Sequence, residues 1–237
     1  MSRVPVAVLV SGSGTNLQAL IDATADPTHP ARIVVVVADR PKAFGLERAR
    51  RAGIPTEVVL KRDHPDRAAY DAALAQTLTR YGVEWVCLAG FMKVVGSPML
   101  EAFPDRILNI HPALLPAFPG LHGPAQALAH GVCIAGATVH LVDEGMDTGP
   151  IVIQGAVPVL EGDDEHTLAQ RILTRVEHVI YPRALRWAAE GRLVVERAGR
   201  ARVRVEGAER QVWGGTPRER EAPATGDAPA HVPGVTP

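Results

Sequence analysis

Short apolar runs rich in β-branched residues alternate with longer amphipathic segments over most of the chain, and this alternation restricts the fold more than any other feature. Residues 6–10, 33–37 and 85–88 have the length and composition of buried strands. The segments between them place apolar residues at helical spacing. The pattern predicts an α/β fold, a doubly wound and mostly parallel sheet with helices on both faces.

The later part of the chain continues the pattern with less regularity. Further strands are expected at residues 57–60, 107–110, 134–141 and 151–159. A helix should begin near residue 63 and end before Gly82. A longer helix should run from about 163 to about 190 and bend at Tyr181-Pro182, because proline lacks an amide donor. The strand-like pieces 192–196 and 202–206 predict a hairpin.

A glycine-rich loop follows the first predicted strand and precedes a helix, and it reads Ser11-Gly12-Ser13-Gly14-Thr15-Asn16. Amide groups at a helix start point outward, and the helix dipole favours an anion there. The loop therefore predicts a site for phosphate or a similar anion, with a ligand-free capped turn as the alternative. Leu17 breaks the dinucleotide fingerprint, and no lysine follows as in a P-loop. Asp39 leaves a nicotinamide enzyme open as a second alternative.

Two later loops carry groups suited to acyl transfer. Asn109 and His111 share one face of a predicted strand, so an amide and an imidazole project together. The amide suits a developing oxyanion, and the imidazole suits proton transfer. The acidic loop 143–150 contains Asp147 and is expected at the same sheet edge. An isolated strand-end histidine and a solvated acidic turn are the alternatives, and a packed, hydrogen-bonded role is favoured for His140.

Composition narrows the chemistry and the partners. The 25 basic and 26 acidic residues give a net charge of −1, which predicts neither a nucleic-acid nor a membrane partner. Cys87 and Cys133 lie in apolar runs, which predicts buried free thiols in a reducing compartment, the cytoplasm. The histidines and cysteines lack metal-ligand spacing, so no metal is expected. No nucleophile motif occurs, which favours direct transfer without a covalent enzyme intermediate.

Six segments between residues 4 and 195 resemble glycinamide ribonucleotide formyltransferases, the folate-dependent enzymes of purine biosynthesis. They are VAVLVSGSGTNLQALID, AFGLERARRAGIP, LAGFMKVV, LNIHPALLPAFPGLHG, TVHLVDEGMDTGPI and VEHVIYPRAL. The resemblance implies a formyltransferase-like fold with a Rossmann-like N-terminal half. It also implies transfer of a formyl group from 10-formyltetrahydrofolate, a co-substrate, to the amine of glycinamide ribonucleotide. Relatives of this kind are monomers or homodimers.

The resemblance also assigns roles to residues. The implied catalytic residues are Asn109, His111 and Asp147. The implied ribonucleotide-binding residues are Gly12, Ser13, Gly14, Thr15, Asn16 and Glu177. The implied folate-binding residues are Arg67, Met92, Lys93, Val94, Val95, Asn109, Asp143, Glu144, Gly145, Met146 and Asp147. Departures from the family pattern occur at Ala113, Ala117 and 123–125, outside the catalytic set.

The expected organisation is one formyltransferase domain over residues 1–206. Its first half, to about 105, would bind the ribonucleotide phosphate, and its second half would carry the catalytic and folate loops. A Gly- and Pro-rich tail over 207–237 is expected to be disordered. Formyltetrahydrofolate deformylase and methionyl-tRNA formyltransferase share the fold and stay as alternatives, although both usually carry an additional domain for which this chain leaves no room.

Overall fold

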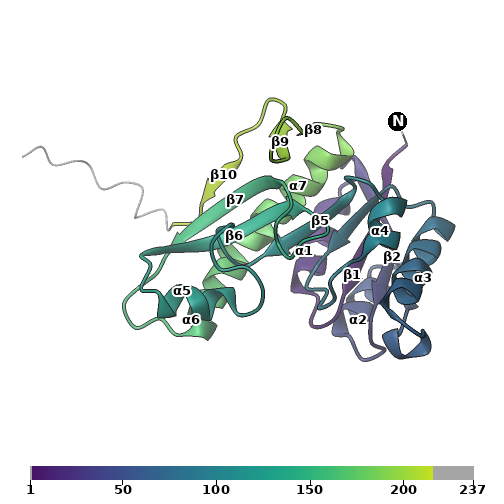
Figure 1. Cartoon of the computed structure of the whole chain (residues 1–237), viewed down its shortest axis with the longest axis horizontal. Coiled ribbons are helices and arrows are strands. Elements are labelled where there is room, and N and C mark those ends of the chain that lie inside the picture. Colours follow the sequence, from purple (N-terminus) through teal and green to yellow (C-terminus); the bar gives the residue numbers. More distant parts are fainter. Residues whose placement is uncertain (1, 216–237) are drawn as a thin grey trace, which may run out of the picture.

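The structure is a computed structural model that describes residues 2–215. Its helices are α1 (Thr15–Thr24), α2 (Phe44–Arg51), α3 (Arg67–Arg80), α4 (Ser97–Ala102), α5 (Gly123–Ala129), α6 (Glu165–Ile172) and α7 (His178–Ala189), with a 3₁₀ turn at Lys61–Asp63 and a π-helical segment at Leu173–Glu177. Its strands are β1 (Val4–Val10), β2 (Ala31–Ala38), β3 (Thr56–Val58), β4 (Trp85–Leu88), β5 (Ile107–His111), β6 (Ile134–Leu141), β7 (Ile151–Pro158), β8 (Leu193–Glu196), β9 (Arg202–Val205) and β10 (Gln211–Trp213). Figure 1 shows how these elements follow one another.

Eight strands form one sheet in the order β10-β7-β6-β5-β4-β1-β2-β3. The strands from β5 to β3 pair in parallel, as the alternation of strands and helices predicts. Beyond β5 the direction changes, because β6 is antiparallel to β5 and β7 is antiparallel to β6. The mostly parallel, doubly wound fold is confirmed, with an antiparallel part that positions the second half of the site.

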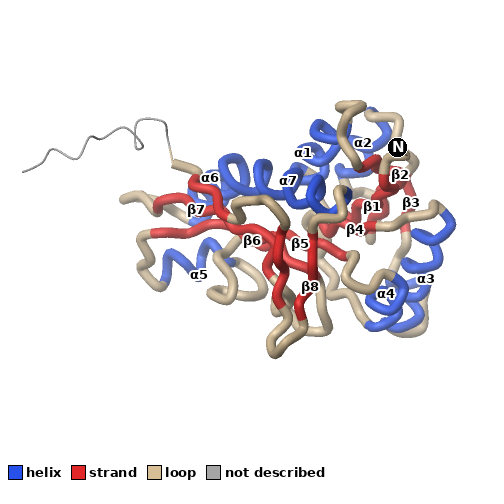
Figure 2. Tube along the Cα trace, turned by 90° about the horizontal axis from the view of Figure 1, so that it is seen from above, coloured by secondary structure: helices blue, strands red, loops and turns tan. Residues whose placement is uncertain are grey.

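Helices cover both faces of the sheet. In Figure 2, α1, α2, α6 and α7 lie above the strands, and α3 and α4 lie below them. Alternate residues of β1 divide accordingly: Val8 packs in the core under α1 and α7, whereas Leu9 packs against α3 and α4. On β5 the same alternation sends Leu108 toward the first core and Ile107 toward the second. Asn109 and His111 therefore share the face of Ile107.

The last described strand corrects the predicted tail. Residues 207–215 belong to the described part of the chain, and β10 there pairs in parallel with β7, so disorder from 207 onward is a wrong prediction for this stretch. The rest of the predicted tail, 216–237, lies outside the described residues. The predicted hairpin is confirmed, because β8 and β9 pair in antiparallel fashion.

Helix α7 contains Pro182, where the sequence predicts a bend, and the regular α-helical pattern is interrupted five residues earlier, at the π-helical segment. Cys87 is buried, as predicted, but Cys133 is exposed because it precedes the start of β6. None of the helices within residues 2–215 has both the length and the apolar character needed to cross a membrane.

Candidate active site

The glycine-rich loop connects β1 to α1 and leaves the helix start open. Gly14 precedes α1 with a φ of 70°, and no side chain caps the first turn. A side chain at Gly14 is disfavoured by this positive φ and also by the lack of space, since a Cβ atom there would lie 2.7 Å from Gly45 Cα. Helix α2 supports the loop from behind, because Gly45 N–H donates to the Gly12 carbonyl and Arg48 Nε donates to the Ser13 carbonyl. The uncapped N–H groups can therefore donate hydrogen bonds to an anion.

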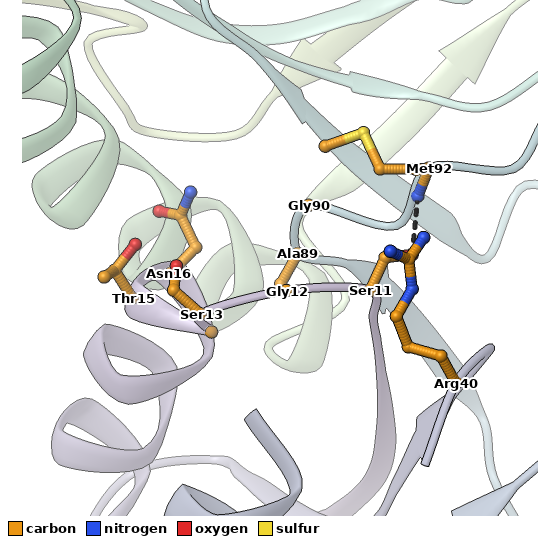
Figure 3. A pocket seen from close by; sticks show the side chains of 10 residues that line it. Ser11, Gly12, Ser13, Thr15, Asn16, Arg40, Ala89, Gly90 and Met92 are labelled. Carbon is orange, nitrogen blue, oxygen red and sulfur yellow. Dashed lines mark hydrogen bonds between the residues drawn. The ribbon is translucent and has the colours of Figure 1, made fainter. Parts of the chain in front are cut away.

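A cavity of about 220 Å³ opens beside this loop. It is lined by Ser11, Gly12, Ser13, Gly14, Thr15, Asn16, Arg40, Ala89, Gly90 and Met92. Figure 3 shows the loop on one side of the cavity, with Arg40 and Met92 on the other. The strand order explains the meeting, because β4 lies beside β1 and Met92 N–H donates to Ser11 Oγ over 2.8 Å. Sequence reasoning selected the glycine loop and Met92 but missed Arg40.

Asn16 and Glu177 form a buried polar pair at the edge of this cavity. Asn16 Nδ2 donates to Glu177 Oε2 over 2.6 Å, and the two residues are only 8% and 7% exposed. Asn16 Oδ1 is buried and has no hydrogen-bond partner in the described structure. A buried acceptor without a partner is costly, so this oxygen suits a ligand hydroxyl. Glu177 was predicted at the ribonucleotide, and its contact with Asn16 places it next to the predicted loop.

The π-helical segment brings Glu177 to this position. A π turn rotates the residues that follow it relative to a regular α-helix, which is a common feature of functional sites. The segment also packs closely on β7, where Gly155 provides the space. A Cβ atom at Gly155 would lie 2.4 Å from Val176 Cγ1. The glycine is thus needed for the approach of the helix that carries Glu177.

Burial raises the pKa of the Glu177 carboxyl, and the hydrogen bond from Asn16 only partly offsets this effect. A carboxyl whose pKa is higher in the folded state binds a proton on folding at pH values above its unfolded pKa, so its contribution to stability becomes less favourable as the pH rises. We expect Glu177→Gln, which keeps an acceptor for Asn16, to gain stability relative to the parent as the pH rises above the ordinary glutamate pKa of about 4.3. Urea unfolding of both proteins at a series of pH values measures the difference. A difference that stays constant with pH would contradict the raised pKa.

Asn109, His111 and His140 lie on one face of the β5–β6 pair. Asn109 pairs with His140 across the two strands, and its Nδ2 lies 3.1 Å from His140 Nε2. His140 Nδ1 lies 2.8 Å from the Leu141 carbonyl, which orients the ring so that Nε2 faces the Asn109 amide. This contact fixes the Asn109 side chain and leaves its second amide proton for a ligand. The packed, hydrogen-bonded role predicted for His140 is confirmed, but its contact with Asn109 was missed.

Asp147 comes to these residues from the loop between β6 and β7. Its Oδ2 lies 3.4 Å from His111 Nδ1, and its Oδ1 lies 3.6 Å from His140 Nε2. Gly120 N–H donates to Oδ2 over 2.8 Å. The backbone of Asp147 has a φ of 56°, in the left-handed region where few residues other than Gly, Asn and Asp occur. Such conformations concentrate at functional sites.

The electrostatic setting keeps Asp147 ionised. Burial alone would raise the pKa of the carboxyl, but the nearby His140 side chain, the Gly120 N–H and the charge of His111 together lower it below its usual value. His111 is 4% exposed, and its Nε2 lies 2.9 Å from the Phe118 carbonyl oxygen. Both ring nitrogens of His111 therefore face oxygen acceptors, an arrangement that suits an imidazole able to carry two protons. A proton donor thus lies next to an amide donor.

The shared-edge argument for the acidic loop is wrong in one respect. Because β6 is antiparallel to β5, its carboxyl end lies beside the amino end of β5, with Leu141 paired to Leu108. The loop reaches the site by folding over the sheet face. The predicted meeting of Asp147 and His111 is confirmed for this different reason.

The predicted folate residues other than Asn109 and Asp147 fall into three groups. Arg67, Val95 and Glu144 line a second cavity of about 550 Å³. Met92, Val94 and Met146 are exposed apolar side chains. Lys93 lies 3.6 Å from the buried Asp39 carboxylate, and Asp143 accepts from Gly145 N–H and Thr148 Oγ1 within its own loop.

Two further observations concern Arg67, which was predicted to bind the folate, and metal binding. Arg67 Nε lies 3.5 Å from Asp71, which also accepts from the Gly96 amide and so connects α3 to the segment after Val95. Across residues 2–215, no group of three or more His, Cys, Asp or Glu side chains is arranged to hold a metal ion.

Comparison of the chain with known proteins identifies the family to which it belongs. The model of the formyl transferase family matches residues 4–185. The chain belongs to the formyl transferase family. The phosphoribosylglycinamide formyltransferase of Escherichia coli is 43% identical over 188 residues, which cover 79% of this chain and 88% of the relative. The solved structure of glycinamide ribonucleotide transformylase 1 from Symbiobacterium toebii is 58% identical, covers 86% of this chain and 94% of that one, and has a TM-score of 0.82.

Longer relatives of the formyl transferase family also match. The trifunctional purine biosynthetic protein adenosine-3 of Drosophila pseudoobscura pseudoobscura is 51% identical over 193 residues. These residues cover 81% of this chain but only 14% of that protein. The chain therefore spans about one seventh of this relative. Formyl transferase membership accounts for the fold, while the roles of individual residues follow from the geometry and remain predictions.

Proposed function

We propose that the chain transfers the formyl group of 10-formyltetrahydrofolate to the amine of glycinamide ribonucleotide, a step of de novo purine biosynthesis. The observation that carries the proposal is the cluster of Asn109, His111 and Asp147 on one sheet face. Asn109 and His111 lie on β5, and Asp147 reaches them from the loop after β6; β5 is next to β4, whose following segment lines the cavity at the glycine loop. A site for acyl transfer and a site for a phosphorylated substrate thus lie on neighbouring strands.

The reaction assigns a role to each group of the cluster. The substrate amine attacks the formyl carbon, a C–N bond forms, and the carbonyl electrons move to oxygen in a tetrahedral intermediate. The second Asn109 amide proton stabilises this oxyanion, together with His111, whose Nε2–H exchanges the Phe118 carbonyl for the oxyanion. The bond between the formyl carbon and the folate nitrogen then breaks, and that nitrogen takes up a proton while the attacking amine loses one. Asp147, ionised beside His111, orients the imidazole and stabilises it when it carries two protons.

The proposed ribonucleotide site uses the glycine loop and the buried pair behind it. The phosphate binds the open amides of residues 12–16 at the start of α1. The ribose hydroxyls meet Glu177, which accepts from them, and Asn16 Oδ1, which lacks a partner of its own. Both residues are buried, so a substrate lacking these hydroxyls leaves acceptors unpaired and binds less well.

The proposed folate site runs along the segment after β4 and the acidic loop. The exposed side chains of Met92, Val94 and Met146 supply apolar surface for a flat ring system. Arg67, on the second cavity, offers a cation for the carboxylates of the glutamate tail. Loop backbone groups near Asp143 and Gly145 can bind the polar edge of the pterin.

A transfer assay tests the proposed function directly. Formyl-labelled 10-formyltetrahydrofolate is incubated with the purified protein, with and without glycinamide ribonucleotide. We expect labelled formyl-ribonucleotide only when the acceptor is present. Label released as formate regardless of the acceptor would identify a formyltetrahydrofolate deformylase, and no transfer in either case would exclude both activities. A nicotinamide enzyme is disfavoured because the Asp39 carboxylate is already paired with Arg40 and Lys93.

We also propose that the enzyme works in the cytoplasm on small molecules alone, as a monomer or a homodimer, without a metal, nucleic acid or a membrane. Its two cysteines are both free thiols, in keeping with a reducing compartment.

A further inference from the structure

Asp39 was singled out by its position after β2, yet the proposed reaction gives it no role. Its side chain is only 2% exposed, although aspartate carboxylates are rarely buried without a cation. Two cations flank it: Arg40 Nε at 3.1 Å and Lys93 Nζ at 3.6 Å. The pair with Arg40 is a fork, because Arg40 Nη2 also donates to the second carboxylate oxygen over 3.4 Å. The carboxylate therefore fixes the plane of the Arg40 guanidinium.

Arg40 is the only charged residue among those that line the cavity at the glycine loop. Its guanidinium lies across the cavity from Ser13 and Asn16 (Figure 3). Two of its five N–H donors bind Asp39, and the other three have no protein partner within the described part of the chain. Its side chain is 52% exposed, so a ligand can reach these donors. Guanidinium forks match the geometry of phosphate oxygens.

The other wall of the cavity, opposite Arg40, carries polar groups without partners in the described structure. Asn16 Oδ1 is buried and unpartnered at its far side, and the amides of the glycine loop are uncapped. A phosphorylated sugar satisfies all of these groups together, with its hydroxyls at Asn16 and its phosphate between the α1 amides and Arg40. The start of helix α1 supplies only a partial positive charge, whereas a phosphate carries nearly two negative charges. The full positive charge of Arg40 on the opposite wall offsets part of the negative charge that the helix leaves unbalanced.

Resting on the proposed function, we infer that Arg40 binds the substrate phosphate directly and that Asp39 is the positioning residue that holds Arg40 over the cavity. In this role Asp39 favours phosphate binding even though its own charge is negative. A carboxylate near a phosphate is repulsive by Coulomb's law, so its presence is useful only if the orientation of Arg40 outweighs that repulsion. Removal of the Asp39 charge should therefore weaken phosphate binding, whereas electrostatic repulsion alone would predict tighter binding.

Binding of ribose 5-phosphate, measured by calorimetric titration, tests the inference without requiring catalysis. We expect Arg40→Ala to weaken binding roughly 10- to 100-fold, as for the loss of a hydrogen bond between charged groups. Arg40→Lys should recover part of this loss, because it restores the charge but not the fork. Lys42→Ala is the matched control, since it removes the same charge from an exposed residue of the same loop that does not line the cavity. Equal affinities for Arg40→Ala and Lys42→Ala would overturn the inference.

Asp39→Asn tests the positioning role. We expect it to weaken ribose 5-phosphate binding in the parent protein, and to leave binding unchanged or slightly tighter when Arg40 is already alanine, because only the repulsion is then removed. Tighter binding in Asp39→Asn, or an equal loss in both backgrounds, would overturn the role of Asp39. In the transfer assay, Arg40→Ala should raise the KM for the ribonucleotide and leave the KM for the folate unchanged. A parent protein that binds ribose 5-phosphate through Arg40 but transfers no formyl group would refute the proposed function and leave this inference intact.

Discussion

Replacing Asp147 with asparagine is expected to lower kcat by about 10²- to 10⁴-fold, the range for loss of assisted proton transfer. The substitution removes the charge that lies 3.4 Å from His111 Nδ1 and keeps the size of the side chain. Asparagine also tolerates the φ of 56° and can still accept from Gly120 N–H, so the loop should keep its conformation. The measurement is steady-state formyl transfer, together with the affinity for ribose 5-phosphate, which should not change.

A matched control exists elsewhere in the fold. Asp105 also has a left-handed backbone, with a φ of 55°, and its carboxylate pairs with Arg197 on the surface. Asp105→Asn therefore makes the same chemical change in the same backbone conformation, where an exposed ion pair contributes little. We expect its kcat to match the parent. If Asp147→Asn also keeps kcat within threefold of the parent, Asp147 does not assist the reaction.

Replacing Asn109 with alanine is expected to lower kcat/KM by about 10²- to 10³-fold, as for the loss of one positioned oxyanion donor. Most of the effect should be in kcat, because the amide acts on charge that develops in the transition state. The KM for the ribonucleotide should stay close to the parent value. A loss expressed mainly in KM would instead indicate that Asn109 binds the substrates in the ground state.

A double variant separates the role of Asn109 from that of its neighbour. His140 Nε2 holds the Asn109 amide at 3.1 Å, so His140→Ala should reduce kcat less than Asn109→Ala does. If His140 acts through Asn109, the two substitutions together should be no worse than Asn109→Ala alone. Additive losses would show that His140 contributes by another route.

The fold was predictable where local patterns decide it. Each valine-rich run became a strand, and the period of two in β5 correctly placed Asn109 and His111 on one face. The glycine loop was placed at a helix start because turn residues, a buried strand and an amphipathic segment all agree there. The parallel order β4-β1 then brings the loop and the segment before Met92 together.

Other parts depend on contacts that no local pattern encodes. The change to antiparallel pairing at β6 was missed, because the apolar composition of residues 134–141 suits a buried strand whether it pairs in parallel or antiparallel fashion. The pair of Asn16 and Glu177 joins positions 161 apart, and it relies on a π turn that the sequence pattern does not reveal. Arg40 looks like an ordinary surface arginine in the sequence. Only the fold places its guanidinium on the cavity wall.

The pairing of β10 with β7 has a consequence for how much of the chain must be kept. A protein shortened at residue 206 would retain every residue of the candidate site. Yet it would lose the bonds from Gln154 N–H to the Arg210 carbonyl and from Gly214 N–H to the Ala156 carbonyl, which occupy the outer side of β7. An uncovered strand edge is a template for pairing between molecules. The last strand of the described part thus covers the edge of β7, and a protein shortened before it risks aggregation with its chemistry intact.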